Sequence, residues 1–295
     1  MATDLSASFN EQYININTKL KKRFMRKPNI TEAANEFLAL AIQCEHSEQP
    51  AFAGQTYVGA AKCEASIGNV LGEAEHYISA ARQFMKAEKK LAALKFHSPD
   101  RENLEAAIGC YTQALSKYPE KSPIRTSILL ELAEELVSLD LKSEALVYYE
   151  QALGTATNGV VNLMCSRKII NLLIDCRKYE YALEMANKIC ESNIHIPEGV
   201  LTEIQVSRIL LALLVEPTEE IRSDSLKQLL HDLLSDEDSS ALPFNMDLRL
   251  KLQSIIISSS MDPSSLVSVV AGSKTYFTLQ QRELLETLIL EKQTE

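Results

Sequence analysis

Apolar residues recur every three or four positions along most of this 295-residue chain, a spacing that is typical of one face of an α-helix. The segment AIGCYTQALSKYP shows a distinctive arrangement of small and aromatic residues within this pattern. There Ala107, Tyr111 and Ala114 occupy positions i, i+4 and i+7, and Pro119 follows. Such positions share one helical face, where small alanines allow a second helix to approach and a tyrosine ring fills the gap. Pro119 then prevents the helix from continuing.

The same arrangement of small and aromatic residues occurs again elsewhere in the chain. The segment ALVYYEQAL repeats it at Ala145, Tyr149 and Ala152, and looser copies begin at Ala74 and Ala182. The four leading alanines are 33, 38 and 37 residues apart. Periods in this range are typical of proteins built from helical repeats.

A partner helix is expected before three of the copies, at residues 50–68, 123–139 and 160–176. Ser122 and Pro123 have the residue types of an N-cap and a first helical position for the second of these. The spacing of small, aromatic, small and proline positions resembles the second helix of a tetratricopeptide repeat. We therefore predict an all-α fold, a tetratricopeptide-like α-solenoid of stacked antiparallel helical hairpins with a C-terminal helical cap.

The repeat phase is lost after Pro217, so we divide the chain there. Residues 1–217 are expected to hold an N-terminal basic helix and the repeat array. Residues 218–295 are expected to form a helical region continuous with the solenoid. Within it we predict an exposed loop at SDEDSSALP, a short helix near Leu266, begun by Asp262 or Ser264, and longer helices at 222–234, 244–260 and 276–292.

The last helix carries several leucines broadly on one side, Leu285 and Leu288 among them. Two interpretations remain open for this apolar side. It covers the open end of the solenoid, as a terminal repeat unit must, or it inserts against a partner. On the second interpretation Leu285 and Leu288 are partner-binding residues.

Near the N-terminus, Tyr13, Ile16, Leu20 and Phe24 predict an amphipathic helix over residues 10–26. Most of its remaining surface toward the C-terminal end is basic, and Asn29 with Glu32 resembles a capping box for the next helix. A docking face for an acidic partner surface is the leading interpretation. A solvated helix end, an import signal and an anionic-lipid contact are the alternatives. The basic residues are Lys19, Lys21, Lys22, Arg23, Arg26 and Lys27.

Composition limits the classes of function. A formal net charge of −10 argues against nucleic acid as a partner. The six cysteines are spread singly, and the N-terminal residues lack the layout of a signal peptide, so we expect reduced thiols and a cytoplasmic protein. The longest apolar run, ILLALLV, is too short to span a bilayer, so no stable membrane insertion is expected.

Motifs that carry chemistry are missing from the sequence. It holds no GxxxxGK[ST] loop, GxGxxG turn or GxSxG elbow, and its five histidines are isolated from cysteine pairs. We therefore expect no enzymatic activity, no cofactor and no metal. Arg167 and Asn171 have the i, i+4 spacing of a peptide-carboxylate clamp, but the other first helices offer no matching pair, so we expect a structural role for them.

Four segments carry a resemblance to a known family. KLKKRFMRKPNITEA resembles the N-terminal signature of the forty-kilodalton huntingtin-associated proteins, also called factor VIII intron 22 proteins. The segments EIQVSRILLALLVEP, LPFNMDLRLKLQSIIIS and YFTLQQRELLETLILEKQ are similar to later stretches of that family, in the same order. The chain lacks the Ala/Gly-rich start and the Pro-rich insertion of the vertebrate forms, and a short loop at SNIHIPEGV takes the place of the insertion.

The resemblance implies a partner. It implies an α-solenoid held between the helical-repeat domains of huntingtin, which it stabilises as a constitutive subunit. It also implies a link to the small GTPase Rab5 and to early-endosome motility. A nuclear location would follow from the import-signal interpretation of the basic segment. The alternative function is a membrane-fusion adaptor like the soluble NSF-attachment proteins, which AAKCEASIGNVLGEAEHYISAARQF resembles in character, although that function leaves both ends of the chain unexplained.

Overall fold

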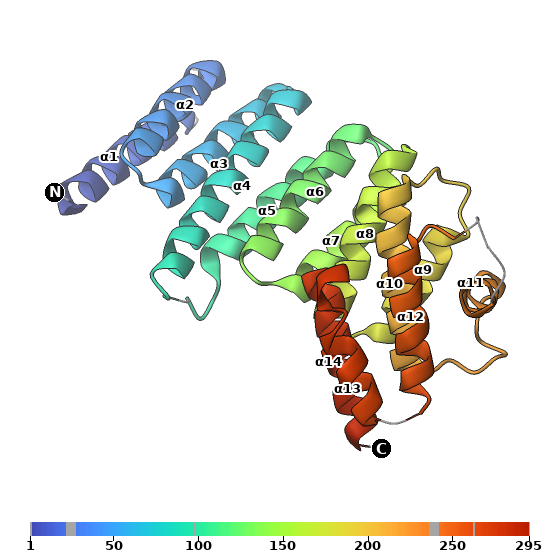
Figure 1. Ribbon diagram of the computed structural model, residues 1–295. Coiled ribbons are helices and arrows are strands. Elements are labelled where there is room, and N and C mark those ends of the chain that lie inside the picture. Colours follow the sequence, from blue (N-terminus) through green and yellow to red (C-terminus); the bar gives the residue numbers. More distant parts are fainter. Residues whose placement is uncertain (1, 22–27, 97, 236–241, 262, 295) are drawn as a thin grey trace. The chain divides into compact units, whose positions relative to one another are not determined.

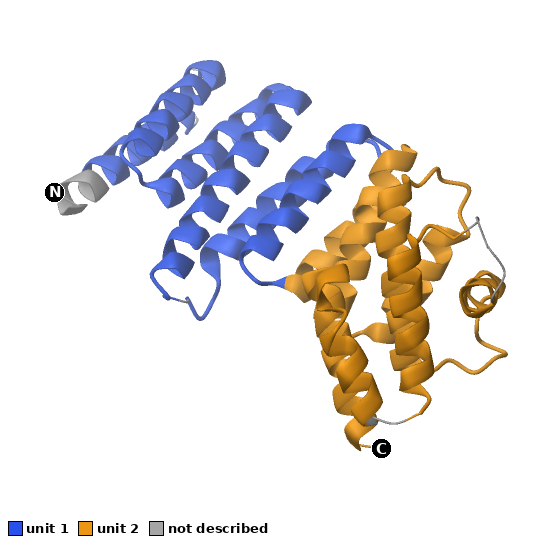
Figure 2. Cartoon of the chain, in the orientation of Figure 1, with its two compact units in different colours: residues 1–141 blue, residues 142–295 orange. Residues whose placement is uncertain are grey.

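The computed structural model describes the chain except for Met1, residues 22–27, His97, residues 236–241, Asp262 and Glu295. The described residues form helices and contain no β-strand, which confirms the predicted all-α class (Figure 1). The chain divides into two compact units, unit 1 (Met1–Leu141) and unit 2 (Lys142–Glu295), coloured separately in Figure 2. The division predicted after Pro217 therefore lies inside unit 2.

In unit 1, each helix packs against the next one along the chain. The N-terminal helix begins earlier than predicted, because no glycine or proline interrupts the residues before Asn10. It ends at Leu20. Phe24, expected on its apolar face, lies outside the described residues. The helices of unit 1 are α1 (Ala2–Leu20), α2 (Ile30–His46), α3 (Pro50–Ile67), α4 (Val70–Ala93), α5 (Glu102–Leu115) and α6 (Pro123–Ser138).

The beginning of α2 follows the predicted capping pattern. The Asn29 side-chain oxygen accepts a hydrogen bond from the backbone N–H of Glu32 at 3.2 Å, and the Asn29 amide donates to the Glu32 carboxylate at 3.0 Å. At α6 the predicted N-cap Ser122 occupies the expected position but makes no side-chain capping bond. Pro123 is the first residue of that helix.

The residues of the repeat pattern lie in the cores of the two units. Ala107, Tyr111 and Ala114 on α5 each have an exposed fraction of 0%. The corresponding residues of α7 are equally buried: Ala145, Tyr149 and Ala152. α5 ends at Leu115, and Pro119 follows in the turn after it.

Two of the three expected helix pairs lie within a single unit. The helix predicted at 50–68 is α3, which packs on α4, and the helix predicted at 160–176 is α8, which packs on α9. The third expected pair, α6 with the helix that carries Ala145, is divided between the two units.

In unit 2, α7 to α10 pack in chain order, and α14 returns to contact α10 and α8. Because of this return, the segments before and after Pro217 share one core. All the helices predicted after Pro217 are found, within a few residues of their expected bounds. The helices of unit 2 are α7 (Lys142–Thr155), α8 (Gly159–Asp175), α9 (Tyr179–Cys190), α10 (Glu198–Val215), α11 (Asp224–Leu234), α12 (Met246–Ser259), α13 (Pro263–Ala271), the 3₁₀ turn η1 (Lys274–Tyr276) and α14 (Leu279–Thr294).

Candidate partner-binding surfaces

The N-terminal helix α1 is held to unit 1 by aromatic rings. Phe9 and Ile16 are buried, and the rings of Phe9 and Phe52 stack with their centroids 4.4 Å apart. Tyr13 also packs on Phe37 of α2, with ring centroids 5.5 Å apart. These contacts fix which side of α1 faces the core and leave its polar side at the surface.

The predicted basic face lies at the end of this helix. Lys19 forms an ion pair with Glu36 of α2, with 2.5 Å between Nζ and Oε1. The positive charge of Lys19 is therefore partly neutralised within unit 1. Lys21 is exposed. The other four basic residues lie outside the described residues: Lys22, Arg23, Arg26 and Lys27. An acidic partner for this segment therefore stays a prediction.

A charged cluster joins α4, α5 and α6 in unit 1. Two nitrogens of Arg82 donate to the two carboxylate oxygens of Glu131 at 2.7 and 2.8 Å, and the Tyr111 hydroxyl donates to the same carboxylate at 2.8 Å. Burial raises the pKa of Glu131, but the hydrogen bonds from Arg82 and Tyr111 outweigh it, so the pKa is lower than its ordinary value. The cluster therefore holds an ionised carboxylate between three helices.

A second polar cluster lies inside unit 2, around Arg208 of α10. This side chain has an exposed fraction of 1%. Its nitrogens donate to Asn187 at 2.6 Å, to Ser223 at 3.0 Å and to Ser225 at 2.5 Å. The Ser225 hydroxyl in turn donates to Glu191 at 2.7 Å. The guanidinium thus ties α9 and the start of α11 to α10.

Arg208 lies inside the segment EIQVSRILLALLVEP, yet the sequence analysis did not single it out. The available signal was a lone arginine ahead of a long apolar run, which indicates a buried charge that needs polar partners. Burial lowers the pKa of Arg208 and raises that of the neighbouring Cys190 thiol. A thiol with a raised pKa is a poor nucleophile, so this cluster is suited to holding helices in place.

The last helix is attached to unit 2 by its apolar side. Leu285 and Leu288 have exposed fractions of 0% and 2%. The buried Gln281 donates to the backbone carbonyl of Glu203 and to the hydroxyl of Ser207, both at 3.1 Å. The side chains of Leu285 and Leu288 thus fill the core against the other helices of unit 2. A partner-binding role for these two residues stays a prediction.

The two residues considered for a peptide clamp make contacts within unit 2. Arg167 forms an ion pair with Glu203 at 2.5 Å. The backbone carbonyl of Asn171 accepts a hydrogen bond from Gln280 at 2.8 Å. Both positions thus help to fasten α8 to α10 and α14, which agrees with the structural role expected for them.

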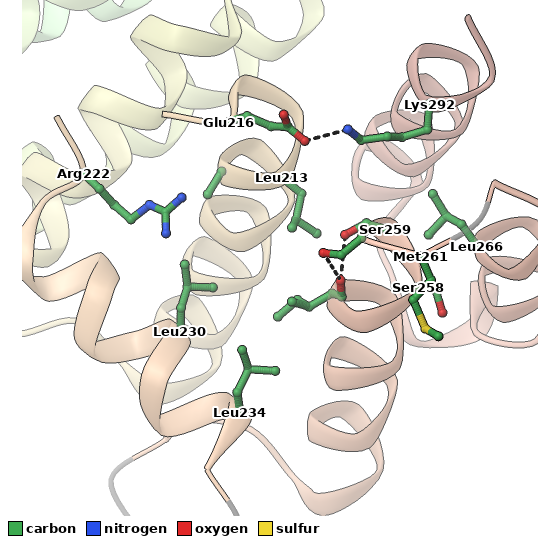
Figure 3. A pocket seen from close by; sticks show the side chains of 13 residues that line it. Leu213, Glu216, Arg222, Leu230, Leu234, Ser258, Ser259, Met261, Leu266 and Lys292 are labelled. Carbon is green, nitrogen blue, oxygen red and sulfur yellow. Dashed lines mark hydrogen bonds and ion pairs between the residues drawn. The ribbon is translucent and has the colours of Figure 1, made fainter. Parts of the chain in front are cut away.

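A hollow of about 640 Å³ opens at one end of unit 2, between α10, α11, α12 and the end of α14 (Figure 3). Its lining combines aliphatic side chains, Leu213, Leu230 and Leu266 among them, with the hydroxyl-bearing Ser258 and Ser259. At its edge Glu216 and Lys292 form an ion pair at 2.6 Å, and Arg222 reaches in from the opposite side. The recess is therefore mixed in character, with polar and aliphatic groups in its lining and charged groups at its margin.

Chemistry-bearing groups do not gather in the part of the chain that the structure describes. No group of three or more His, Cys, Asp or Glu residues there could hold a metal ion. The six cysteines are free, and burial raises the pKa of several of their thiols, Cys110 to about 11. Among the described helices, none has both the length and the apolar character that crossing a bilayer requires.

Comparison with known proteins identifies two similar curated sequences. Both are named 40-kDa huntingtin-associated protein, one from Rattus norvegicus and one from Mus musculus. Each is 29% identical to this chain over 151 residues, which is 50% of this chain and 39% of the relative. The matched region therefore spans about two fifths of the length of these relatives. No protein-family profile matches the chain.

Proposed function

We propose that this chain, a homologue of the 40-kDa huntingtin-associated protein, is a non-enzymatic adaptor that binds and stabilises huntingtin as a constitutive subunit of a complex. The observation that carries the proposal is the similarity to two curated relatives that bear this name. The four resembling segments, which appear in the family's order along the chain, point to the same partner.

The fold that suits this function is a tetratricopeptide-like α-solenoid. Two features support it in unit 1, the packing of each helix on the next and the buried Ala–Tyr–Ala pattern on α5. In unit 2, the packing of α14 on α10 fits a helical cap over the end of the repeats. A stack of helical hairpins presents long surfaces for another protein, and scaffolding is the usual role of such folds.

The membrane-fusion alternative has weaker support. Neither curated relative is named as a fusion adaptor. We keep the family's link to Rab5 and early-endosome motility as a second part of the proposal, together with a cytoplasmic location and sites of action at the early endosome and in the nucleus. Purified Rab5 loaded with GTP or GDP tests this part, because an effector-type adaptor is expected to bind the GTP form selectively.

The main proposal is tested by affinity purification of the tagged chain from cells of its own organism. We expect huntingtin to co-purify in a fixed stoichiometric ratio and to remain bound through gel filtration. We also expect the level of soluble huntingtin to fall when the adaptor is depleted, because a subunit that binds only the folded state stabilises it. A purification that contains no huntingtin would contradict the proposal.

The basic segment is tested by charge reversal. The double change Lys21→Glu with Arg23→Glu is expected to weaken huntingtin binding, most strongly at low salt, because exposed charges are screened as ionic strength rises. The exposed pair Lys62 and Lys86, changed to glutamate together, controls for the altered net charge. Equal binding by the two double variants would leave the segment as a solvated helix end.

A further inference from the structure

The start of α6 carries a four-residue sequence that protein kinases recognise. Residues Ser122 to Arg125 read Ser-Pro-Ile-Arg. Proline-directed kinases accept a serine followed by proline, because proline has no backbone N–H that would lose its hydrogen bond in an apolar pocket of the kinase. One class of these kinases also reads a basic residue three positions after the serine by its charge. Arg125 occupies that position, so both recognition features are present.

Ser122 lies in an accessible turn. The turn joins α5 to α6 within unit 1, and Ser122 is partly exposed. Its backbone is extended, with φ −104° and ψ 134°, as is usual for a residue before proline. The neighbouring residues are exposed: Glu120, Lys121, Pro123 and Ile124. The serine is therefore in the backbone conformation in which a kinase binds its substrate, and its surroundings leave room for an enzyme.

The fold does not use the Ser122 hydroxyl as a helix cap. At five other α-helices the N-cap side chain accepts a hydrogen bond from a backbone N–H, and these N-caps are Asn29, Asn69, Asn158, Ser223 and Asn245. Ser122 occupies the same position at α6 and makes no such bond. A chemical group added to this oxygen therefore breaks no capping bond.

The first turn of α6 has few bonds to lose when a kinase extends it. The first backbone bond of this helix runs from the Thr126 N–H to the Ser122 carbonyl at 3.1 Å. The N–H groups of Ile124 and Arg125 therefore have no acceptor within the helix, and Pro123 has no N–H at all. Because helix ends also fray, residues 122–125 can adopt the extended backbone that a kinase binds.

A second copy of the sequence pattern differs in its local structure. Residues 98–101 read Ser-Pro-Asp-Arg. The Arg101 N–H donates to the Ser98 carbonyl at 3.2 Å, which closes the four residues into a turn. Arg101 also has a positive φ of 49°. The local structure therefore favours Ser122 over Ser98 as the substrate.

We propose that Ser122 is a phosphorylation site for a proline-directed serine kinase that reads a basic residue three positions after the serine. The kinase transfers the γ-phosphoryl group of ATP. The bond from the γ-phosphorus to the bridging oxygen breaks, a bond from the Ser122 Oγ to phosphorus forms, and ADP leaves. The hydroxyl proton passes to the catalytic aspartate of the kinase. The inference is independent of the proposed function.

The phosphate has a stabilising effect that follows from its position. It carries nearly two negative charges next to the positive end of the α6 dipole. Its oxygens are acceptors for the backbone N–H groups of Ile124 and Arg125, and the exposed Lys121 adds a positive charge beside it. Phosphorylation therefore supplies the capping interaction that the unmodified serine does not make.

The site is tested on the full chain with ATP and a purified cyclin-dependent kinase bound to its cyclin, a kinase of this class. Mass spectrometry of peptides cut after glutamate is expected to locate one phosphate on Ser122, and none there in Ser122→Ala. Pro123→Ala, which keeps a good helix former at the start of α6, should lower the initial rate at least about tenfold, because its N–H is left without an acceptor in the kinase. The matched control Ser98→Ala should leave the rate at Ser122 unchanged.

Thermal melting provides an independent measurement. Ser122→Ala is expected to melt within about 1 °C of the original chain, since it loses no capping bond. The phosphorylated chain should melt about 2 °C higher, and phosphatase treatment should reverse the shift.

The chain purified from dividing cells of its own organism is expected to carry the same phosphate. Phosphate found only on Ser98, or a Ser122 that is unmodified in such cells, would overturn the site. Phosphate on Ser122 without a higher melting temperature would overturn its capping of α6.

Discussion

At the scale of single residues, Arg208 brings a charge into the core of unit 2 without a carboxylate at hydrogen-bond distance. The oxygen of Glu191 is 4.0 Å from the guanidinium, and the direct partners are amide and hydroxyl oxygens. Such a group is stable only because each side of the guanidinium finds an acceptor, which requires α9, α10 and the start of α11 to meet in one place.

Changing Arg208 to Met keeps most of the side-chain length but removes every donor. The oxygens of Asn187, Ser223 and Ser225 then lose their buried partner, so we expect the free energy of unfolding to fall by about 2–3 kcal/mol. Urea denaturation followed by circular dichroism measures this. Lys168→Met, at an exposed position of α8, is the control and is expected to change stability by less than about 0.5 kcal/mol. If the Arg208 variant has the same urea midpoint as the original chain, the hydrogen bonds of Arg208 do not stabilise unit 2.

Glu131 predicts a pH dependence in unit 1. Its pKa is lower in the folded chain than in the unfolded one, so its stabilisation is complete above the unfolded value, about 4.3, and is lost as the pH falls through the folded value. Glu131→Gln is therefore expected to cost about 1 kcal/mol at pH 7, since Arg82 is largely exposed and solvent screens the pair.

The variant and the original chain should approach equal stability only as the pH falls below the lowered folded pKa of Glu131. Thermal melting between pH 3 and pH 7, with Glu134→Gln on the exposed side of α6 as the control, measures the difference. If the stability difference between Glu131→Gln and the original chain stays constant over this pH range, the charge of Glu131 does not contribute to that difference.

At the scale of elements, α3 is a helix of small residues between two neighbours. Gly59 allows α3 to approach α2 so closely that a Cβ atom at this position would lie 2.9 Å from the ring of Phe37, which is itself 1% exposed. The sequence predicted a helix at 50–68, but helix propensity alone would rate its glycines as unfavourable. The close approach explains why glycine is present.

Two glycine substitutions are expected to change the stability of unit 1 in opposite directions. Gly59→Ala should destabilise unit 1 by about 1–3 kcal/mol, because the buried Phe37 ring has to shift. Gly109→Ala, on α5, has no atom within 4 Å of the added Cβ and should stabilise by up to about 1 kcal/mol through helix propensity alone. Thermal melting of the two variants beside the original chain tests the pair, and two changes of the same sign would contradict the packing explanation.

At the scale of the whole molecule, the boundary between compact units differs from the boundary in the repeat pattern. The pattern ends at Pro217, yet α14 is tied to α10 through Gln281 and through the Lys292–Glu216 ion pair. The repeat pattern in the sequence reflects only the packing of neighbouring helices. A hydrophobic core, by contrast, can include any segments that contact one another, however far apart they lie in the chain.

This difference predicts how fragments behave. A fragment of residues 142–295 contains all of unit 2 and is expected to show helical circular dichroism with a cooperative melting transition. A fragment of residues 218–295 keeps α14 but lacks α8 and α10, so Leu285 and Leu288 lose the helices that bury them. It is expected to be unfolded or to aggregate. Two equally cooperative fragments would instead favour the boundary after Pro217.

Much of the fold was accessible from the sequence. The helices, the N-cap at Asn29 and the buried Ala107–Tyr111–Ala114 face follow from residue type and spacing within one helix, which are local properties. The resemblance of four segments to the huntingtin-associated proteins was accessible for the same reason, because residue order is itself the signal.

Only the tertiary structure decided which apolar surfaces are covered. Leu285 and Leu250 both belong to apolar helical patterns, yet the first is buried and the second is 52% exposed. The difference arises from contacts between residues far apart in the chain, such as Gln281 with Ser207, 74 positions away. Periodicity determines that a helix has an apolar face, but which partner covers that face depends on how the chain returns on itself.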